Sequence, residues 1–166
     1  VELPDSSGWS IMGSRYAYMD LEVDVPVGIA LDVRDSSGDI EIDGTGAVAV
    51  KDSSGDIDIE NVTGDVVLED SSGDIDLVSI TGNVTVQQDS SGDIDGRRIE
   101  GAVLVEKDSS GDIRFREVRD DFVVERDSSG DITGRNIGGN FTVERDGSGE
   151  IRSDNVSGVV DIPEKS

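Results

Sequence analysis

One six-residue phrase recurs along this chain and constrains its fold more than any other feature. Asp-Ser-Ser-Gly-Asp-Ile occurs six times and returns once as Asp-Gly-Ser-Gly-Glu-Ile, with the seven copies beginning at Asp35, Asp52, Asp70, Asp89, Asp108, Asp127 and Asp146. The spacing grows from 17 to 18 and then stays at 19 residues. A fixed period just below about 20 residues, in a chain with no helical pattern, is typical of a solenoid.

The residues between the copies alternate between apolar and polar. In the third unit the apolar set is Ile75, Leu77, Ile80, Val84 and Val86, broken by a Gly turn. This period of two predicts short, half-buried strands, and the frequent Gly and Asp-Ser-Ser clusters disfavour a helix. We therefore predict an all-β fold, a single parallel β-solenoid of about eight coils of 17–19 residues. We expect right-handed winding, because right-handed crossovers predominate in general. The pattern does not decide whether each coil has two sides or three.

Stacked coils place like residues in columns about 4.8 Å apart. One inward column is expected to hold the isoleucine of every copy: Ile40, Ile57, Ile75, Ile94, Ile113, Ile132 and Ile151. In another column Phe115 stands between Gly96 and Gly134, which leave room for its ring, and Phe122 and Phe141 share a third. Aromatic pairs favour offset stacking, so the last two rings are expected to stack.

The period divides the chain into three parts. Residues 1–19 are an N-terminal cap or assembly arm, residues 20–162 are the repeat domain, and residues 163–166 are a short tail. Leu21, Val23 and Val25 alternate before a Pro-Val-Gly turn, which predicts one further coil ahead of the first copy. The chain begins with valine and shows no signal peptide, so we interpret it as a processed or trimmed product.

Composition excludes several classes of function. The 166 residues contain no cysteine and no histidine, and 38 acidic against 14 basic side chains give a net charge of −24. Disulfides, thiol chemistry and the commonest general base are therefore absent, and we predict no enzyme and no cofactor. Nucleic acid is an unfavourable partner for so acidic a chain, and no apolar run approaches the roughly 20 residues of a membrane span.

The repeat pattern is similar to that of a known family. A Val-Pro-Val-Gly lead-in at Val25–Gly28, followed by Ser-Gly-Asp-Ile units alternating with x-Gly-x-Val-x-Val units, resembles the bacterial adhesin-like β-strand-repeat domains. The resemblance covers roughly Leu21 to Ile162 and implies an exported or envelope-associated β-solenoid. No catalytic residues are described for that family, so none are transferred.

The first Asp of each copy raises the question of a metal site. Two carboxylates about 4.8 Å apart repel by roughly 1 kcal/mol in water and about 3.5 kcal/mol at an effective dielectric of 20, so the column needs relief. Calcium is one answer, with the ladder Asp35, Asp52, Asp70, Asp89, Asp108, Asp127 and Asp146 as candidate ligands. The favoured interpretation has no metal: the first Asp accepts N–H bonds from the Ser-Ser-Gly turn, the second Asp faces water, and preceding basic residues such as Lys107 offset the charge.

A cluster of basic residues interrupts the acidic surface. The candidate patch for an anionic ligand, such as a surface glycan, is Arg97, Arg98, Arg114, Arg116 and Arg135. The alternative is that these arginines offset neighbouring acids. Serine nucleophiles are not expected, because nothing activates them and they recur in every copy.

The predicted function is a non-catalytic extracellular or cell-envelope β-solenoid, a structural or adhesin-like scaffold that stacks head to tail into filaments. Its assembly interface would join an apolar N-terminal segment to the last coil, through Trp9, Ile11, Tyr16, Tyr18, Val156, Val160 and Ile162. A self-capped monomer is the competing arrangement. The alternative function is a monomeric envelope module that binds calcium or cationic peptides on its acidic faces.

Overall fold

The structure, a computed structural model, describes residues 21–26 and 28–164, and within them it is all-β, with fifteen strands and no helix. Eight strands form sheet A: β1 (Leu31–Arg34), β3 (Val48–Lys51), β5 (Val66–Glu69), β7 (Val84–Gln88), β9 (Val103–Val105), β11 (Phe122–Val124), β13 (Phe141–Val143) and β15 (Val160–Asp161). Seven form sheet B: β2 (Ile40–Asp43), β4 (Ile57–Val62), β6 (Ile75–Ile80), β8 (Ile94–Ile99), β10 (Ile113–Val118), β12 (Ile132–Ile137) and β14 (Ile151–Val156).

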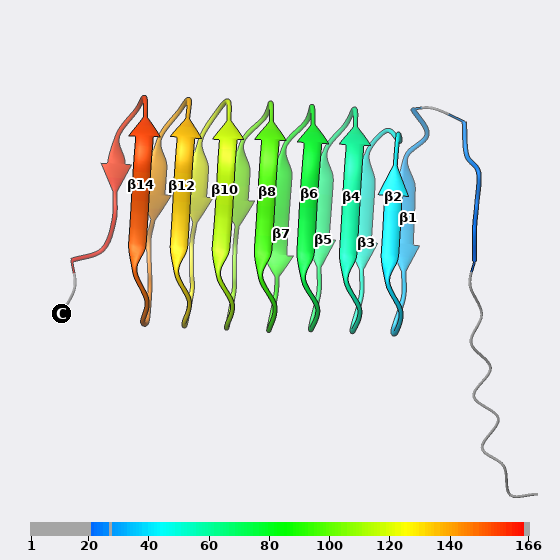
Figure 1. The fold of residues 1–166 in the computed structure, drawn as a ribbon, viewed down its shortest axis with the longest axis horizontal. Coiled ribbons are helices and arrows are strands. Elements are labelled where there is room, and N and C mark those ends of the chain that lie inside the picture. Colours follow the sequence, from blue (N-terminus) through cyan, green and yellow to red (C-terminus); the bar gives the residue numbers. More distant parts are fainter. Residues whose placement is uncertain (1–20, 27, 165–166) are drawn as a thin grey trace, which may run out of the picture.

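Successive strands alternate between the two sheets, so the chain winds as a two-sided parallel β-solenoid of about seven turns. Each strand pairs in parallel with the equivalent strand of the next coil, and the register follows the repeat, with Ile57 opposite Ile75 and Ile75 opposite Ile94. In Figure 1 the front strands run upward and the rear strands downward while the chain advances from right to left. That winding is right-handed, as predicted.

The additional coil predicted before the first copy is only half formed. Its second half is β1, which pairs with β3. Residues 21–26 form no strand, and Leu21 and Val23 are 79% and 64% exposed. The segment lies beside the first coil and does not pair with β2 (Figure 1). Pro26, the last residue of this stretch, has no N–H to donate to a sheet, and its carbonyl oxygen accepts the N–H of Ile29 in a turn.

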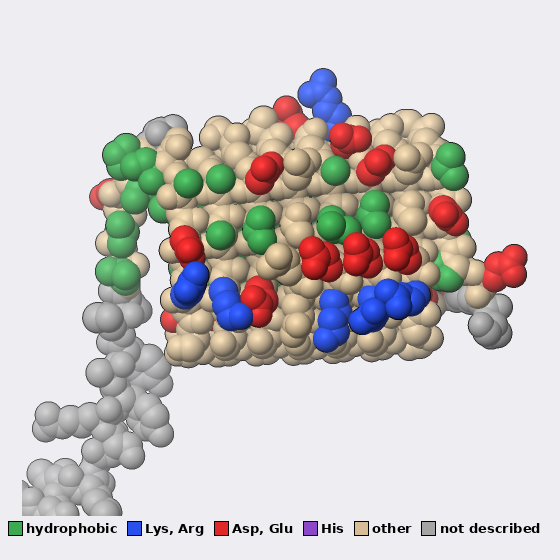
Figure 2. All heavy atoms as spheres, turned by 180° about the vertical axis from the view of Figure 1, so that it is seen from behind, with side chains coloured by type: hydrophobic (Ala, Val, Ile, Leu, Met, Phe, Trp, Pro, Cys, Tyr) green, Lys and Arg blue, Asp and Glu red, His purple; other side chains and the backbone are tan. Residues whose placement is uncertain are grey.

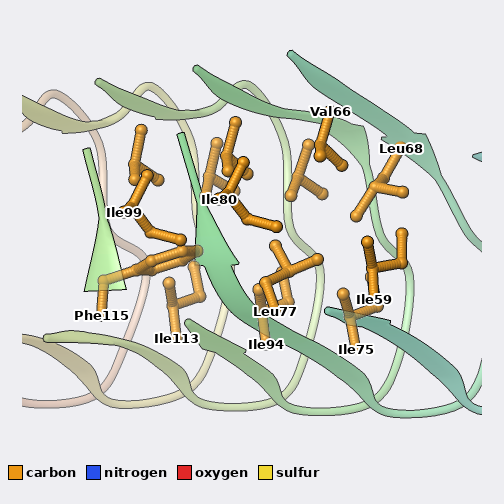
Figure 3. Close-up of a cluster of buried hydrophobic side chains, with 14 of the residues drawn as sticks. Ile59, Val66, Leu68, Ile75, Leu77, Ile80, Ile94, Ile99, Ile113 and Phe115 are labelled. Carbon is orange, nitrogen blue, oxygen red and sulfur yellow. The ribbon is translucent and has the colours of Figure 1, made fainter. Parts of the chain in front are cut away.

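The core lies between the sheets and consists of the residues that the alternation marks as inward. The isoleucine column is buried from Ile40 to Ile132, and only Ile151, in the last complete coil, is half-buried. Figure 3 shows isoleucines and leucines of both sheets packing toward one another, with the ring of Phe115 among them. This layer of aliphatic contacts is continuous, which makes each coil the packing template for the next.

The aromatic columns confirm the predicted fit. Phe115 is 1% exposed, and a methyl group built on Gly96 would stand 2.1 Å from its Cε1 atom. The ring therefore occupies the space that the glycine leaves. Phe122 and Phe141 stack with ring centroids 5.1 Å apart, and Phe115 lies 5.0 Å from Phe122.

Most strands of sheet B contain a kink that simple alternation does not predict. Their burial runs in, out, in, out, out, in, because the fifth residue adopts a positive φ, as in Asn61 (φ 56) and Arg98 (φ 56). The left-handed turn lets one more apolar residue, such as Val62 or Ile99, reach the core. Asparagine tolerates this backbone, whereas the arginine is strained there.

The glycine of the repeated phrase is fixed by the stacking itself. Gly73 has φ +130, and a Cβ there would stand 1.9 Å from the carbonyl oxygen of Gly55 in the preceding coil. Only a residue without a side chain allows the coils to approach this closely.

Candidate functional site

The first Asp of each phrase lies at the corner that follows sheet A. Its side chain lies inside the solenoid in the middle copies, whereas Asp35 is exposed and Asp146 is half-buried. Asp52, Asp70, Asp89, Asp108 and Asp127 are all buried. As predicted, this carboxylate holds the turn: Oδ1 of Asp108 accepts N–H bonds from Ser109 at 2.6 Å and from Ser110 at 3.3 Å.

The second oxygen of these carboxylates has no partner. Oδ2 of Asp52, Asp89, Asp108 and Asp127 is buried and accepts no hydrogen bond, and neither oxygen of Asp70 accepts one. Burial raises the pKa of Asp89 and of Asp127 to about 6, against the hydrogen bonds from the serine amides. Burial, together with the charges of Asp89 and Asp127 on either side, raises the pKa of Asp108 to about 7. These three carboxyls therefore hold a proton at a higher pH than an ordinary aspartate does, which lowers the repulsion between them.

The basic residues that precede these aspartates do not offset them, contrary to the sequence interpretation. Alternation turns neighbouring side chains to opposite sides, so Lys51 points outward, where it pairs with Glu69. Figure 2 shows the resulting row of Lys and Arg side chains along the outer face of sheet A, with acidic side chains beside it. The buried column receives no positive partner among the described residues.

The second Asp of each phrase also differs from its prediction. Its side chain lies near the surface, but Oδ1 accepts the backbone N–H of the equivalent residue one coil further on, as in Asp93 to Asp74 at 2.9 Å and Asp112 to Asp93 at 2.9 Å. Hydrogen bonds and Arg114 lower the pKa of Asp93. This carboxylate column is thus a ladder between coils and not simply a solvated row.

Serine hydroxyls form a parallel ladder. The Oγ of Ser110 donates to the backbone carbonyl of Ser90 at 3.1 Å, and Ser129 donates to Ser109 at 3.2 Å. The serines therefore serve the turn, which is the structural role expected from the sequence.

No group of three or more acidic side chains in the described residues is arranged to hold a metal ion. The candidate ladder from Asp35 to Asp146 is a single row of carboxylates. In most of them one oxygen accepts a hydrogen bond from a serine N–H of the same turn. Calcium prefers six to eight oxygen ligands, which a single row does not supply.

Calcium is therefore expected to bind without defined stoichiometry and to raise the melting temperature no more than magnesium at equal ionic strength, because both ions only screen the net charge. Calorimetry and thermal melting in each salt test this expectation. Several stoichiometric calcium sites, or a stabilisation that magnesium cannot match, would contradict it.

The structure brings together most of the predicted arginine patch. Arg97, Arg116 and Arg135 form one outward column on sheet B, and Arg114 lies in the neighbouring column. Arg98 does not join them, because its left-handed backbone places it at the edge, where its Nε donates to Ser79 Oγ at 3.0 Å.

Arg152 completes this patch and was missed by sequence reasoning. It lies in the column of Arg114, two coils further on, and binds Asp131 at 2.6 Å. Counting in steps of 19 residues from Arg114 through Thr133 would have found it.

An open groove of ≈ 730 Å³ runs along the kinked edge of sheet B. Its lining includes Ile99 and Val118 between charged side chains such as Arg119 and Glu100, which approach to 3.6 Å. These groups repeat along the groove and do not converge on one point.

Both ends of the solenoid leave core residues uncovered. At the C-terminal end Val160 and Ile162 are 42% and 43% exposed, and Val156 is half-buried. The other half of the predicted assembly interface, Trp9, Ile11, Tyr16 and Tyr18, lies outside the described residues. The structure therefore places only the C-terminal half of that interface.

No protein-family model, curated protein or solved structure matches this chain. In the part of the chain that the structure describes, no helix has the length and apolar character needed to cross a membrane.

Proposed function

We propose that the protein is a non-catalytic structural scaffold of the cell envelope or extracellular space, whose solenoids stack head to tail into filaments. The observation that carries this proposal is that, among the described residues, the coils at both ends of the solenoid leave inward residues of the repeat partly exposed. The resemblance to adhesin-like repeat domains supports a location in the cell envelope or the extracellular space. The uniform short turns offer no set of convergent catalytic groups and fit a structural role.

The C-terminal end presents the side of a coil that further coils cover elsewhere. In β14 the inward residues Ile151 and Val156 are half-buried, whereas their equivalents Ile132 and Ile137 in β12 are fully buried. The difference is that β14 lies beside β12, whereas among the described residues no further strand of sheet B lies beside β14. Sheet edges of this kind carry free backbone groups and bind further strands readily.

The N-terminal end complements it. Leu31 and Val33 of β1 pack on the core but are only half-buried. The carboxylate ladder has a direction, because each N–H donates to the preceding coil: Asp56 donates to Asp39, and Glu150 donates to Asp131. Placing the N-terminal end of one copy on the C-terminal end of another therefore offers the N–H of Asp39 to the carboxylate of Glu150 and continues the ladder.

Such a contact is heterologous, and a heterologous contact that does not close produces a filament. The net charge of −24 opposes it at low ionic strength, because every added copy repels its neighbours. Salt at or above physiological concentration shortens the Debye length to about 8 Å and removes most of this repulsion.

The proposal predicts that raising salt and protein concentration converts the full chain into filaments, and that Val160→Lys prevents this. Val160 is already 42% exposed, so the lysine leaves the fold intact but places a charge in the contact. Val123→Lys is the matched control, because it adds the same charge in mid-solenoid on the outer face of sheet A. Light scattering after size exclusion and electron microscopy measure the result.

Deleting residues 1–19 separates the two arrangements of the N-terminal segment. If the full chain stays monomeric at high salt and the deletion aggregates, the segment caps its own solenoid and the filament proposal is wrong. Filaments from the full chain, unaffected by Val123→Lys and abolished by Val160→Lys, support it.

A further inference from the structure

The outer face of sheet B is divided by charge along the solenoid axis. Over β2, β4 and β6 its two outward columns carry Glu41, Asp43, Asp58, Glu60 and Asp76 with no basic residue. Over β10, β12 and β14 the same columns carry Arg114, Arg116, Arg135 and Arg152, with Asp154 as the one acidic exception. The boundary falls on β8, which carries Asp95 and Arg97.

Contacts within one copy leave much of this charge unmatched. Arg114 and Arg152 bind the carboxylate ladder, through Asp93 and Asp131 among others. Among the described residues neither Arg135 nor Glu60 forms an ion pair. Burial and the like charge of Asp58 raise the pKa of Asp76, as expected where acids crowd without a partner.

We propose that this face binds a second copy of the chain, with the two solenoids antiparallel and sheet B facing sheet B. A two-fold axis along the strand direction, through β8, places β4 opposite β12 and β6 opposite β10. Residues keep their column under this rotation, so Glu60 meets Arg135, Asp76 meets Arg114 and Glu41 meets Arg152, each pair occurring twice. A parallel arrangement would set the acidic halves against each other.

Two shallow depressions on this face follow the same division of charge. A shallow depression of ≈ 350 Å³ is lined by Asp58, Glu60 and Asp76 together with Arg97 and Arg116. A second, of ≈ 380 Å³, is lined by Arg114, Arg116, Arg135 and Arg152. The two-fold rotation sets the first, mainly acidic, opposite the second, which is basic.

The contact is of modest size and not perfectly matched. Six strand spacings of about 4.8 Å and strands about 20 Å long give a face of roughly 600 Å² per copy, the lower end of specific interfaces. Asp43 faces Asp154, and on β8 both Asp95 and Arg97 face their own symmetry mates. We therefore expect a reversible dimer that the net charge of −24 opposes at low ionic strength and that weakens again when salt well above the physiological concentration screens the ion pairs.

A second copy fits this face better than a polyanion such as a sulfated polysaccharide. A polyanion following the arginine column would run onto the five acids of the other half and meet a chain of net charge −24. The antiparallel copy brings three pairs of opposite charges into contact, each twice, on the two halves of the face. At physiological salt, charges farther away than about 8 Å are screened, so these contacts dominate.

The test is a charge exchange measured by sedimentation in the full chain carrying Val160→Lys, so that end-to-end stacking does not contribute. Glu60→Arg and Arg135→Glu are each expected to weaken dimerisation at least about tenfold, because each creates two like-charge contacts. The double variant is expected to restore it. An equimolar mixture of the two single variants is expected to form heterodimers, since each supplies what the other lacks.

Arg126→Glu, on the exposed outer face beside sheet A, is the matched control and should leave the dimer unchanged. The proposal is overturned if the chain stays monomeric at physiological salt and high concentration, or if the double variant and the mixture fail to restore the dimer. Binding of heparin that Arg135→Glu abolishes and Glu60→Arg strengthens, without dimerisation, would assign the face to polyanions instead. These outcomes do not depend on whether the ends form filaments.

Discussion

Raising the pH from about 4 to about 8 is expected to lower the free energy of unfolding by several kcal/mol, a large part of the stability of an ordinary domain. The cause is the buried column of the first aspartates. Burial raises the pKa of Asp89 and Asp127 to about 6 and that of Asp108, between them, to about 7. In the unfolded chain these groups have an ordinary pKa of about 3.9.

The sign follows from proton linkage. Between about pH 4 and pH 7 the folded protein binds more protons at these carboxyls than the unfolded chain does, so stability falls as the pH rises through this range. A raise of two pKa units corresponds to about 2.7 kcal/mol for one group. Below about pH 4 the trend is expected to reverse, because the pKa of Asp93 and of Asp131 is lowered and these groups lose their ladder contacts on protonation.

Denaturant titrations at several pH values measure this dependence. The variant Asp108→Asn tests whether the carboxyl of Asp108 contributes to it. The amide keeps the shape and the acceptor for Ser109 but carries no charge. The variant is expected to be about 2 kcal/mol more stable than the parent at pH 8 and similar at pH 4. Asp161→Asn, at an exposed position, is the control and should change neither value. A stability that rises steadily from pH 4 to pH 8 in the parent would show that the column stays ionised.

Phe115→Ala is expected to lower the free energy of unfolding by about 3–5 kcal/mol, the usual cost of removing a buried phenylalanine. The ring is 1% exposed and lies in the middle of the core (Figure 3). Gly96 and Gly134, its neighbours in the column, have no side chains that fill the void. Chemical denaturation followed by circular dichroism measures the loss, and a loss below about 1 kcal/mol would show that Phe115 is not part of the core.

A double-mutant cycle with Gly96→Ala tests the fit between ring and glycine directly. In the parent the added methyl stands 2.1 Å from Phe115 and must displace the ring, so the substitution destabilises. In the Phe115→Ala background the same methyl enters the vacated space, and we expect its cost to fall by more than about 1 kcal/mol. Equal costs in both backgrounds would mean that the ring does not lie over Gly96.

Much of this architecture follows from the repeat because stacking converts sequence period into position. Once Ile57, Ile75 and Ile94 occupy one column, every other residue of the unit has a defined neighbour, and the packing of Phe115 against Gly96 follows by counting. Counting also reaches the arginine column of sheet B. Counting misplaces Arg98, because the positive φ of this residue and of its equivalents interrupts the alternation and places their side chains at the edge of sheet B.

The candidate sites were less predictable, since their chemistry depends on which side of the chain each residue faces. The sequence places Lys107 directly before Asp108 and so pairs their charges, but a strand turns adjacent side chains to opposite sides. The basic residue therefore lies outside and the carboxylate inside. The neighbours of a carboxylate in the sequence do not determine whether it is buried or solvated. Its burial, however, decides whether its pKa is raised.

The sequence by itself determined the coil length, the parallel register, the inward columns and the absence of thiol and imidazole chemistry, because these depend on period and composition alone. Only the tertiary structure decided that the cross-section has two sides and that residues 21–26 do not pair with the first coil. These features arise where backbone direction changes, at corners, kinks and ends. Their energies come from contacts between coils, which no single unit of the repeat contains.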